Sequence, residues 1–398
     1  MTERSERLPP APHALSPNPR GAEGADLSPV PHPPSPNPEE GSEAAFLLAG
    51  GGTGGHVIPA LAVANELRLR GHRVLFMGTA RGLESTLVPR AGFPLELIDI
   101  GGLKRVGWRQ TAATLWQLPA STLHAGELLA RRGVRAVFSM GGYVAGPPVI
   151  AALARQVPVV VMEPNAVPGF TNRRIAMYVS RALIAFPETA RYFANGRTEV
   201  TGLPVRDEFF RIPQKPRGGT FNVLITGGSQ GSRTLNRAAR ESWAMFHAAG
   251  LPLRIVVQTG PAAYDELRAA FATSNIEGEV LPFIADMPAA FAQADLIVCR
   301  SGAGAVAELA AAGKPAILSP FPFASDQHQL KNAEAFVRAG AARLVEDRDM
   351  TGQHLFEIVA ELAANPAELA RMGEAARMLA HRGAARRAAE ILEEVSRA

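Results

Sequence analysis

A glycine-rich turn followed by a histidine is the part of this sequence with the clearest chemical potential. Residues 50–55 read Gly-Gly-Gly-Thr-Gly-Gly between an apolar run at 45–49 and a helical pattern that opens with His56. Glycine lets the backbone approach a ligand closely, and the free N–H groups of a helix start favour an anion. The positive helix end also disfavours protonation of His56, and a neutral imidazole can accept a proton from an attacking hydroxyl. The turn predicts a phosphate site beside a candidate general base, with a packing histidine as the alternative.

The same order of apolar run, glycine turn and helical pattern returns later in the chain. Residues 221–226 lead into Gly-Gly-Ser-Gln-Gly-Ser at 227–232, and glycine turns at 140–147 and 300–304 also follow apolar runs. Ligands of open parallel sheets bind beyond the carboxyl ends of the strands. We therefore expect these turns to border one cleft that holds a phosphate-bearing ligand.

Polar side chains after other apolar runs are candidates for holding a sugar nucleotide. Glu308 lies one turn into a helical pattern, where it either accepts from two ribose hydroxyls or complements the helix dipole. Asn165 follows the run 157–162 and either binds sugar hydroxyls or caps a helix. Segment 320–333 predicts either a sugar-binding wall or a solvated helix start capped by its aspartate. The polar residues of that segment are Asp326, His328, Gln329 and Asn332.

Two cofactor classes are disfavoured. A G-x-G-x-x-G turn is a weak signal alone, and a nicotinamide dinucleotide site also needs an acidic residue about 20 positions later. The run 73–77 ends instead in Gly-Thr. The nine histidines show no ligand spacing, and Asp347 and Asp349 are interpreted as solvated turn residues rather than a metal clip. We predict neither a metal nor an organic cofactor.

Composition separates residues 1–43 from the rest of the chain. This tail holds 11 of the 32 prolines and no apolar period, which predicts disorder, and it lacks the pattern of a signal peptide. With its three basic and seven acidic residues set aside, 38 basic and 30 acidic residues remain. That excess suits an anionic partner, although mild solvation charge is as good an explanation. The single cysteine, Cys299, fits a reducing cytosol, and no apolar stretch is long enough to span a membrane.

Apolar β-like runs alternate with helical patterns from Ala44 onward, which predicts an α/β fold of parallel sheets with helices on both faces. The chain divides near 200–220, where proline and glycine mark a linker, and is helical after 350. The expected β-like runs are 45–49, 73–77, 95–98, 135–138, 158–162, 181–185, 221–226, 253–257, 279–282, 295–299, 315–318 and 342–345. The expected helices are 57–70, 82–91, 109–131, 145–155, 231–249, 261–273, 303–312 and 327–338.

Residues 102–118 combine basic side chains with two of the three tryptophans. Basic and aromatic residues together suit a bilayer surface that contains anionic lipids. A buried helix face explains the same stretch equally well, so both interpretations stay open.

Five motifs occur in order: Gly51-Gly52-Thr53-Gly54-Gly55-His56, Gly141-Gly142-Tyr143-Val144 with Gly146-Pro147, Gly227-Gly228-Ser229-Gln230-Gly231, Arg300-Ser301-Gly302-Ala303 with Glu308, and Asp326-x-His328-Gln329-x-x-Asn332-Ala333. Together they closely resemble the MurG family, the bacterial N-acetylglucosaminyl transferases of peptidoglycan synthesis. The resemblance covers about residues 44–398 and leaves the tail outside it.

The resemblance implies a GT-B fold, which has two Rossmann-like, doubly wound parallel-sheet domains with an interdomain cleft. The expected division is a disordered tail at 1–43, an acceptor- and membrane-side domain at 44–206, and a UDP-GlcNAc-binding domain at 207–381. A C-terminal helix at about 382–398 would pack back on the first of these domains.

The resemblance also implies the reaction. Members of the family move N-acetylglucosamine from UDP-N-acetylglucosamine to the C4 hydroxyl of undecaprenyl-linked muramyl-pentapeptide, with inversion at the anomeric carbon, which turns lipid I into lipid II. We accordingly expect a peripheral protein on the cytoplasmic side of the cell membrane, with no nucleic-acid partner. A UDP-N-acetylglucosamine 2-epimerase of the same fold and a non-catalytic sugar-nucleotide scaffold are the alternatives.

The resemblance also implies roles for residues of this sequence that lie in the shared motifs. Glu308 would bind the ribose and Ile284 the uracil region, while Gln329 and Asn165 would face the donor sugar. His56 is the expected general base, and Glu163 is the alternative. Residues along the diphosphate would be Arg206, Ser229, Ala303, Gly304, Ala305, Val306 and Ala307, and those bordering the reaction centre Thr53, Gly54 and Gly55.

Two departures from the family pattern affect these expectations. The family often has His-Glu-Gln-Asn where this chain has Met-Glu-Pro-Asn at 162–165, and Leu-Thr-Val-Ser-Glu where it has Gly-Ala-Val-Ala-Glu at 304–308. Without the hydroxyls, phosphate contacts at 305 and 307 must come from the backbone. N–H groups of the turns 227–232 and 302–306 would stabilise the departing diphosphate, which would make a metal unnecessary for that step.

Overall fold

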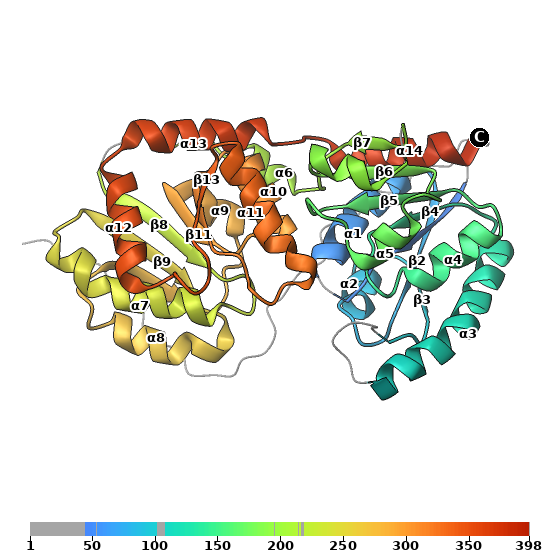
Figure 1. Cartoon of the computed structure of the whole chain (residues 1–398), viewed down its shortest axis with the longest axis horizontal. Helices are drawn as coiled ribbons and strands as arrows, with labels where there is room; N and C mark the ends of the chain where they lie inside the picture. The colour runs from blue at the N-terminus through green and yellow to red at the C-terminus, as the bar shows by residue number, and fades with distance from the viewer. Residues whose placement is uncertain are drawn as a thin grey trace, which may run out of the picture. The chain divides into compact units, whose positions relative to one another are not determined.

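The computed structural model describes residues 44–52, 54–101, 108–194, 196–213, 215 and 219–397, with residues 108–115 and 325 described by their backbone alone. Two parallel sheets run through these residues (Figure 1). The first has seven strands in the order β3-β2-β1-β4-β5-β6-β7, and the second has six in the order β10-β9-β8-β11-β12-β13. Both orders place later strands on either side of the first one, which is the doubly wound arrangement.

The first sheet and its helices occupy the chain up to residue 200. The strands are β1 (Ala45–Ala49), β2 (Arg73–Gly78), β3 (Leu95–Leu97), β4 (Val134–Ser139), β5 (Val159–Glu163), β6 (Arg181–Ile184) and β7 (Thr198–Val200). The helices are α1 (Gly54–Leu69), α2 (Glu84–Arg90), α3 (Trp108–Arg132), α4 (Gly146–Ala154) and α5 (Phe170–Ile175), with a 3₁₀ turn at Pro187–Tyr192.

The second sheet follows a short helix, α6 (Asp207–Phe210). Its strands are β8 (Phe221–Thr226), β9 (Leu253–Gln258), β10 (Glu277–Leu281), β11 (Leu296–Cys299), β12 (Ala316–Leu318) and β13 (Ala342–Leu344). Its helices are α7 (Arg233–Ala248), α8 (Tyr264–Phe271), α9 (Met287–Gln293), α10 (Ala303–Ala312), α11 (His328–Arg338), α12 (Gly352–Ala363) and α13 (Pro366–Met378), and α14 (Ala384–Arg397) ends the chain. Two 3₁₀ turns lie at Pro261–Ala263 and Ser325–Gln327.

Alternation along the strands explains why helices cover both faces of each sheet. In β1, Phe46 and Leu48 belong to one apolar core, while Leu47 between them belongs to the core of the opposite face. In β8, Leu224 faces one core and its neighbours Val223 and Ile225 the other. Strands buried on both faces are apolar at nearly every position, as parallel strands require.

Each expected β-like run overlaps a strand, and the differences concern short elements. The sequence analysis missed β7, α5, α6 and α9. β7 is a three-residue edge strand with two polar side chains, and α6 has only four residues, so neither has a readable period. α9 could have been found, because Asp286 accepts a hydrogen bond from the Ala289 N–H as an N-cap, with a proline in the first turn.

The chain crosses between the two sheets twice, and the crossing segments touch. Gly202, after β7, has φ 72°, and a side chain there would overlap His381, between α13 and α14. Glycine is therefore required at this crossing, both for its backbone conformation and for the space it leaves.

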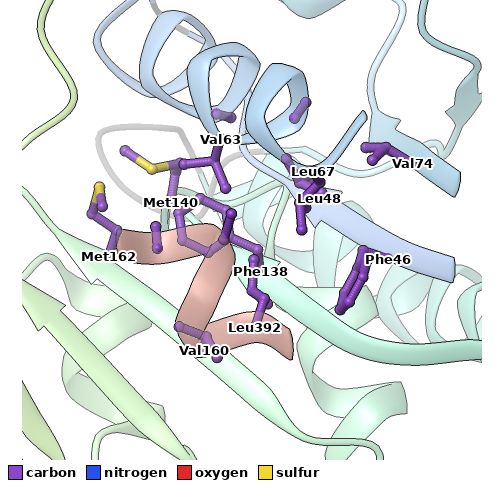
Figure 2. Packing of buried hydrophobic residues seen from close by; sticks show 14 of the residues in the cluster. Phe46, Leu48, Val63, Leu67, Val74, Phe138, Met140, Val160, Met162 and Leu392 are labelled. Carbon is purple, nitrogen blue, oxygen red and sulfur yellow. The ribbon is translucent and has the colours of Figure 1, made fainter. Parts of the chain in front are cut away.

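The last helix completes the core of the first sheet. Ala388, Ile391 and Leu392 of α14 are fully buried in the cluster that contains Phe46 and Phe138. Figure 2 shows Leu392 within this core, together with Phe138 and Val160. A chain that ends before α14 would expose the apolar surface of this face.

Leu392→Ala tests that conclusion. The substitution removes a buried isobutyl group and leaves a cavity, so the free energy of unfolding should fall by about 2–5 kcal/mol. Urea unfolding followed by circular dichroism measures the change. Leu69→Ala is the control, because Leu69 is 63% exposed and its loss should change stability by less than about 0.5 kcal/mol. Equal effects of the two substitutions would contradict this account of α14.

None of the helices in the described part of the chain is both long enough and apolar enough to cross a bilayer. Trp116 on α3 is 87% exposed, so this tryptophan is not part of a buried helix face. Residues 102–107 of the basic and aromatic stretch, and the side chains of 108–115, lie outside what the structure describes.

Candidate active site

His56 stands where two glycine turns meet. The helix starts earlier than expected, at Gly54, so Gly54 and Gly55 form its first positions and His56 lies in its first turn. The Nδ1 atom of His56 is 3.2 Å from the carbonyl oxygen of Gly51. A side chain at Gly142 would contact the imidazole at Nδ1 and Cε1. Gly142 has φ 78°, a backbone conformation that favours glycine at this point of the turn after β4.

The surroundings of His56 favour a neutral ring. Burial lowers the pKa of His56, and the nearby His328 lowers it further, whereas the contact with Gly51 and the Glu84 carboxylate act to raise it. The expected direction is confirmed, and its largest cause is burial. Because a carbonyl oxygen only accepts, the neutral ring carries its proton on Nδ1 and presents a lone pair at Nε2.

Glu163 is arranged as a structural anchor. It ends β5 and is 1% exposed, and burial raises its pKa while its hydrogen bonds act to lower it. One carboxylate oxygen accepts from the backbone and side-chain N–H groups of Asn165, each at 3.1 Å. The other accepts from the Gly169 N–H and from Asn172 Nδ2, each at 3.0 Å. These four bonds hold the loop after β5 in place.

The start of α5 supplies residues that the sequence analysis overlooked. Asn172 Nδ2 donates to the Met162 carbonyl at 3.1 Å, and Thr171 Oγ1 donates to the Gly142 carbonyl at 2.9 Å. These side chains tie the loop after β5 to the glycine turn that faces His56. Their signal in the sequence was two adjacent polar residues, 171 and 172, close behind a buried strand.

Asn332 joins the two sheets and does not line a sugar wall. It is fully buried, donates from Nδ2 to Asn165 Oδ1 and to the Ser301 carbonyl, each at 3.1 Å, and accepts from the Ala166 N–H at 3.0 Å. His328 Nδ1 lies 3.0 Å from the Val167 carbonyl oxygen. The expectation for segment 320–333 was thus wrong for Asn332, because its amide groups are all engaged within the protein.

The aspartate in the same segment is not a helix cap. Asp326 lies in a 3₁₀ turn with φ 50°, and the residue preceding α11 is Gln327, which makes no side-chain cap bond. Gln329, in the first turn of α11, accepts from the Phe321 N–H through Oε1 at 2.9 Å. The Gln329 carbonyl also accepts from Ser301 Oγ, so this residue connects the loops after β11 and β12.

The turn after β8 is held open by packed glycines. Gly228 and Gly231 have φ of 82° and 73°, and a side chain at Gly231 would overlap the Thr259 carbonyl. Gln258 Nε2 donates to the Gly228 carbonyl at 2.8 Å, and Ser232 caps α7 by accepting from the Leu235 N–H. Ser229 at the apex is exposed. This geometry turns the backbone of the loop outward at the carboxyl end of the sheet.

The N-terminus of α10 lies at the neighbouring strand end. Gly302 precedes the helix and has no side chain to cap it. The first intrahelical bond comes from the Val306 N–H to the Gly302 carbonyl, which leaves the N–H groups of Ala303, Gly304 and Ala305 without helical partners. Such a helix start is suited to a phosphate group.

Arg300 connects these two turns. Its guanidinium donates to Ser232 Oγ at 2.7 Å and to the Ser319 carbonyl at 3.0 Å, and it pairs with Asp347 at 2.6 Å. Asp347 Oδ2 also accepts from Thr234 Oγ1. The interpretation of Asp347 as a solvated turn residue was therefore wrong, because a distant arginine that no local pattern reveals holds its carboxylate.

Glu308 lies on α10, the helix whose N-terminus is suited to a phosphate group. Burial raises the pKa of Glu308 to about 7, and the Arg206 guanidinium acts to lower it. An Arg206 nitrogen lies 3.8 Å from Glu308 Oε1, so the structure places Arg206 beside this carboxylate.

Other predicted site residues are placed as follows. Ile284, between β10 and α9, is 8% exposed. Ala307 packs against the core of the first sheet. Thr53 lies outside the described residues.

Metal-binding side chains do not gather in the part of the chain that the structure describes: no three His, Cys, Asp or Glu residues come together there.

Comparisons with known proteins agree with this architecture. Residues 46–184 match the N-terminal domain of glycosyltransferase family 28, and residues 222–393 match its C-terminal domain. A UDP-N-acetylglucosamine–N-acetylmuramyl-(pentapeptide) pyrophosphoryl-undecaprenol N-acetylglucosamine transferase of Solibacter usitatus is 66% identical over 354 residues, which cover 89% of this chain and 97% of that protein. A transferase of the same name from Halorhodospira halophila is 44% identical, over 88% of this chain and 98% of its own.

Solved structures show the same fold. MurG of Acinetobacter baumannii superposes with a TM-score of 0.76 at 33% identity, over 88% of this chain and 99% of its own. A UDP-GlcNAc 2-epimerase from Neisseria meningitidis reaches a TM-score of 0.63 at 13% identity, over 89% of this chain and 100% of its own, a likeness of fold alone. The two-domain GT-B fold expected from the sequence is confirmed. The chain belongs to glycosyltransferase family 28 and, within it, to the MurG family of N-acetylglucosamine transferases.

Proposed function

We propose that this chain transfers N-acetylglucosamine from UDP-N-acetylglucosamine to the C4 hydroxyl of undecaprenyl-linked muramyl-pentapeptide, which converts lipid I into lipid II. The observation that carries the proposal is the 66% identity, over nearly the whole length, to a transferase named for this reaction. An epimerase shares only the fold, at 13% identity, so no comparable observation supports that alternative.

The donor nucleotide occupies the second domain, at the carboxyl ends of its strands. Glu308 accepts from the ribose hydroxyls, Ile284 contacts the uracil, and Arg206 reaches the ribose and the diphosphate beside it. The diphosphate lies against the N-terminus of α10 (residues 303–307) and against Ser229 in the turn after β8. Gln329 and Asn165 face the sugar, each already held by a hydrogen bond to its surroundings.

The acceptor approaches from the first domain. Thr53, Gly54 and Gly55 border the reaction centre, and Nε2 of the neutral His56 takes the proton of the attacking hydroxyl. The hydroxyl oxygen bonds to the anomeric carbon from the face opposite the diphosphate, so the configuration inverts as the bond to UDP breaks. Backbone N–H groups around residues 227–232 and 302–306 stabilise the negative charge that develops on the diphosphate.

The lipid acceptor implies peripheral attachment to the cytoplasmic face of the cell membrane, with no nucleic-acid partner. Support comes from the exposed Trp116 on α3, in the basic and aromatic stretch of the sequence. Each domain binds a different partner. Residues 44–206 and the C-terminal helix bind the acceptor and the membrane, and residues 207–381 bind the donor.

Transfer of radiolabel from UDP-N-acetylglucosamine to a short-chain lipid I analogue tests the proposal. We expect labelled product that carries one added N-acetylglucosamine, and no product when UDP-N-acetylgalactosamine is the donor. Release of UDP or epimerised sugar in the absence of the acceptor would favour an epimerase. Binding of the donor with no turnover would indicate a scaffold.

A further inference from the structure

A buried carboxylate beneath the first glycine turn has no part in the mechanism above. Glu84 is the first residue of α2 and is 0% exposed. Its Oε2 accepts from the Gly52 N–H at 2.8 Å, and its Oε1 accepts from the Thr79 N–H at 3.0 Å and from Thr79 Oγ1 at 2.8 Å. A charged group this deep in a protein needs such partners, and each partner here is a neutral donor.

The space around this carboxylate is reserved for it by three glycines. Side chains at Gly51, Gly78 and Gly82 would each overlap the Glu84 side chain. Burial acts to raise the pKa of Glu84, but the hydrogen bonds from Gly52 and Thr79 outweigh it and hold the pKa below the usual value. The carboxylate is therefore ionised at neutral pH and accepts from all its donors at once.

The bond from the Gly52 N–H links Glu84 to His56 through a single peptide unit. The same peptide group that donates from Gly52 presents the Gly51 carbonyl, and this carbonyl lies 3.2 Å from His56 Nδ1. A carboxylate that accepts from the N–H side of the peptide orients its C=O toward the ring. Because that C=O only accepts, it selects the tautomer with the proton on Nδ1.

We propose that Glu84 is a positioning residue for the transferase reaction: its carboxylate fixes the Gly51–Gly52 peptide, and that peptide holds His56 in the tautomer whose Nε2 can accept a proton. The kinetic part of this inference rests on the proposed role of His56 as general base, whereas the tautomer does not. If the carboxylate merely stabilised the fold, its replacement would leave the tautomer of His56 unchanged.

Glu84→Gln is the main test. The amide would have to point an NH₂ group at either the Gly52 or the Thr79 N–H, so one of these bonds is lost at nearly constant volume. We expect kcat to fall about tenfold, because a displaced general base reacts less efficiently, while KM for UDP-N-acetylglucosamine stays within about twofold. Glu127→Gln, the same change of charge at an exposed position of α3, should leave both constants unchanged.

The pH profile reports the electrostatic influence of Glu84 on His56. The Glu84 charge and the Gly51 contact both act to raise the pKa of His56, whereas burial and His328 lower it. Removing the Glu84 charge takes away one of the two contributions that raise the pKa of His56, so the acid limb of the kcat profile should shift to lower pH. An acid limb that stays in place, together with an unchanged kcat, would overturn the proposal.

Nitrogen NMR of ring-labelled histidine tests the tautomer without reference to activity. His56→Ala identifies the His56 signals among the nine histidines. The wild-type ring should carry its proton on Nδ1, and Glu84→Gln should show both tautomers in exchange. An Nε2-protonated wild-type ring, or an unchanged tautomer in Glu84→Gln, would refute the proposal, and the wild-type measurement remains decisive if that variant does not fold. Full activity of His56→Ala with the predicted tautomers would instead refute only the role of His56 as base.

Glu84→Asp provides a second variant that keeps the charge. Its carboxylate is one methylene shorter and cannot reach Gly52 and Thr79 together, so it should lose kcat while retaining most of the electrostatic influence on His56. In the His56→Ala background, neither change at Glu84 should lower kcat further, because the residue through which Glu84 acts is gone. A full additional loss in that background would show that Glu84 acts elsewhere.

Discussion

His56→Ala is expected to lower kcat by about 10²–10⁴-fold, the usual contribution of a positioned general base. The residue lies where the turns 50–55 and 141–142 meet, its Nδ1 is engaged by the Gly51 carbonyl, and its ring is neutral because burial lowers its pKa. KM for UDP-N-acetylglucosamine should change little, because we propose that the donor binds in the second domain. Steady-state transfer to a lipid I analogue measures both constants.

His247→Ala is the matched control. His247 lies exposed in the last turn of α7, so its loss should leave kcat unchanged. An unaltered kcat in His56→Ala would remove the histidine from the role of base. Glu163 would not be a ready replacement, because its two oxygens already accept four hydrogen bonds from Asn165, Gly169 and Asn172.

The role of His56 as general base also predicts how activity depends on pH on the acid side. The base acts only when unprotonated, so activity should fall as the pH drops through a pKa that lies below the ordinary 6.5 of histidine. Folding is affected in the same direction. Between the lowered folded pKa and 6.5 the unfolded chain binds more protons, so stability also falls as the pH decreases through this window. A single-turnover experiment, in which folded protein is counted by circular dichroism, separates the two effects.

The glycine turns were predictable because their cause is local. A buried parallel strand that ends in glycines and continues as a helix has a recognisable pattern, and the alternation of such units indicates a doubly wound sheet. The turns 50–55 and 227–232 both follow the first strand of their sheet, as the sequence led us to expect. Short elements such as α6 and β7 lack that pattern, and tertiary packing alone defines them.

The connections among the site residues were not predictable, because they join distant parts of the chain. Asn332 bonds to Asn165 across 167 positions and Arg300 to Ser232 across 68, and no local period records such a pairing. The buried Glu84 left only a faint signal, an acidic residue between glycines behind a strand. Sequence alone therefore could not reveal the hydrogen bonds that join these distant residues.

Glu308→Gln is expected to raise KM for UDP-N-acetylglucosamine by about 10- to 100-fold at pH 8.5, with a smaller change in kcat. A hydrogen bond to a charged acceptor contributes about 1.5–3 kcal/mol, and each 1.4 kcal/mol changes affinity about tenfold. The amide oxygen still accepts from a ribose hydroxyl, but without the charge. Glu361→Gln, an exposed position of α12, is the matched control and should have no effect.

The difference in KM between the wild type and Glu308→Gln should become smaller as the pH falls. Because the pKa of Glu308 is raised to about 7, the wild-type carboxylate becomes protonated below that pH and then resembles the amide. KM of the wild type should accordingly rise between pH 8.5 and pH 6, while KM of Glu308→Gln stays flat. Donor binding near pH 7 should release protons, since the ribose hydroxyls favour the ionised form. Calorimetry in buffers of different ionisation enthalpy measures that release.

The stability of the fold should depend on pH in the opposite direction to donor binding: stability should rise as the pH falls, whereas donor binding should weaken. This difference distinguishes a binding role of Glu308 from a structural one. The folded pKa lies above the ordinary 4.5, so the folded protein binds more protons than the unfolded chain between about 4.5 and 7, and its stability rises as the pH falls through that window. Above pH 7 the buried charge costs stability, and Glu308→Gln should be at least as stable as the wild type. A donor that lacks the ribose 2′-hydroxyl provides a further test. Relative to UDP-N-acetylglucosamine, its affinity should fall far more for the wild type than for Glu308→Gln. Equal losses in the two proteins would place the ribose away from Glu308.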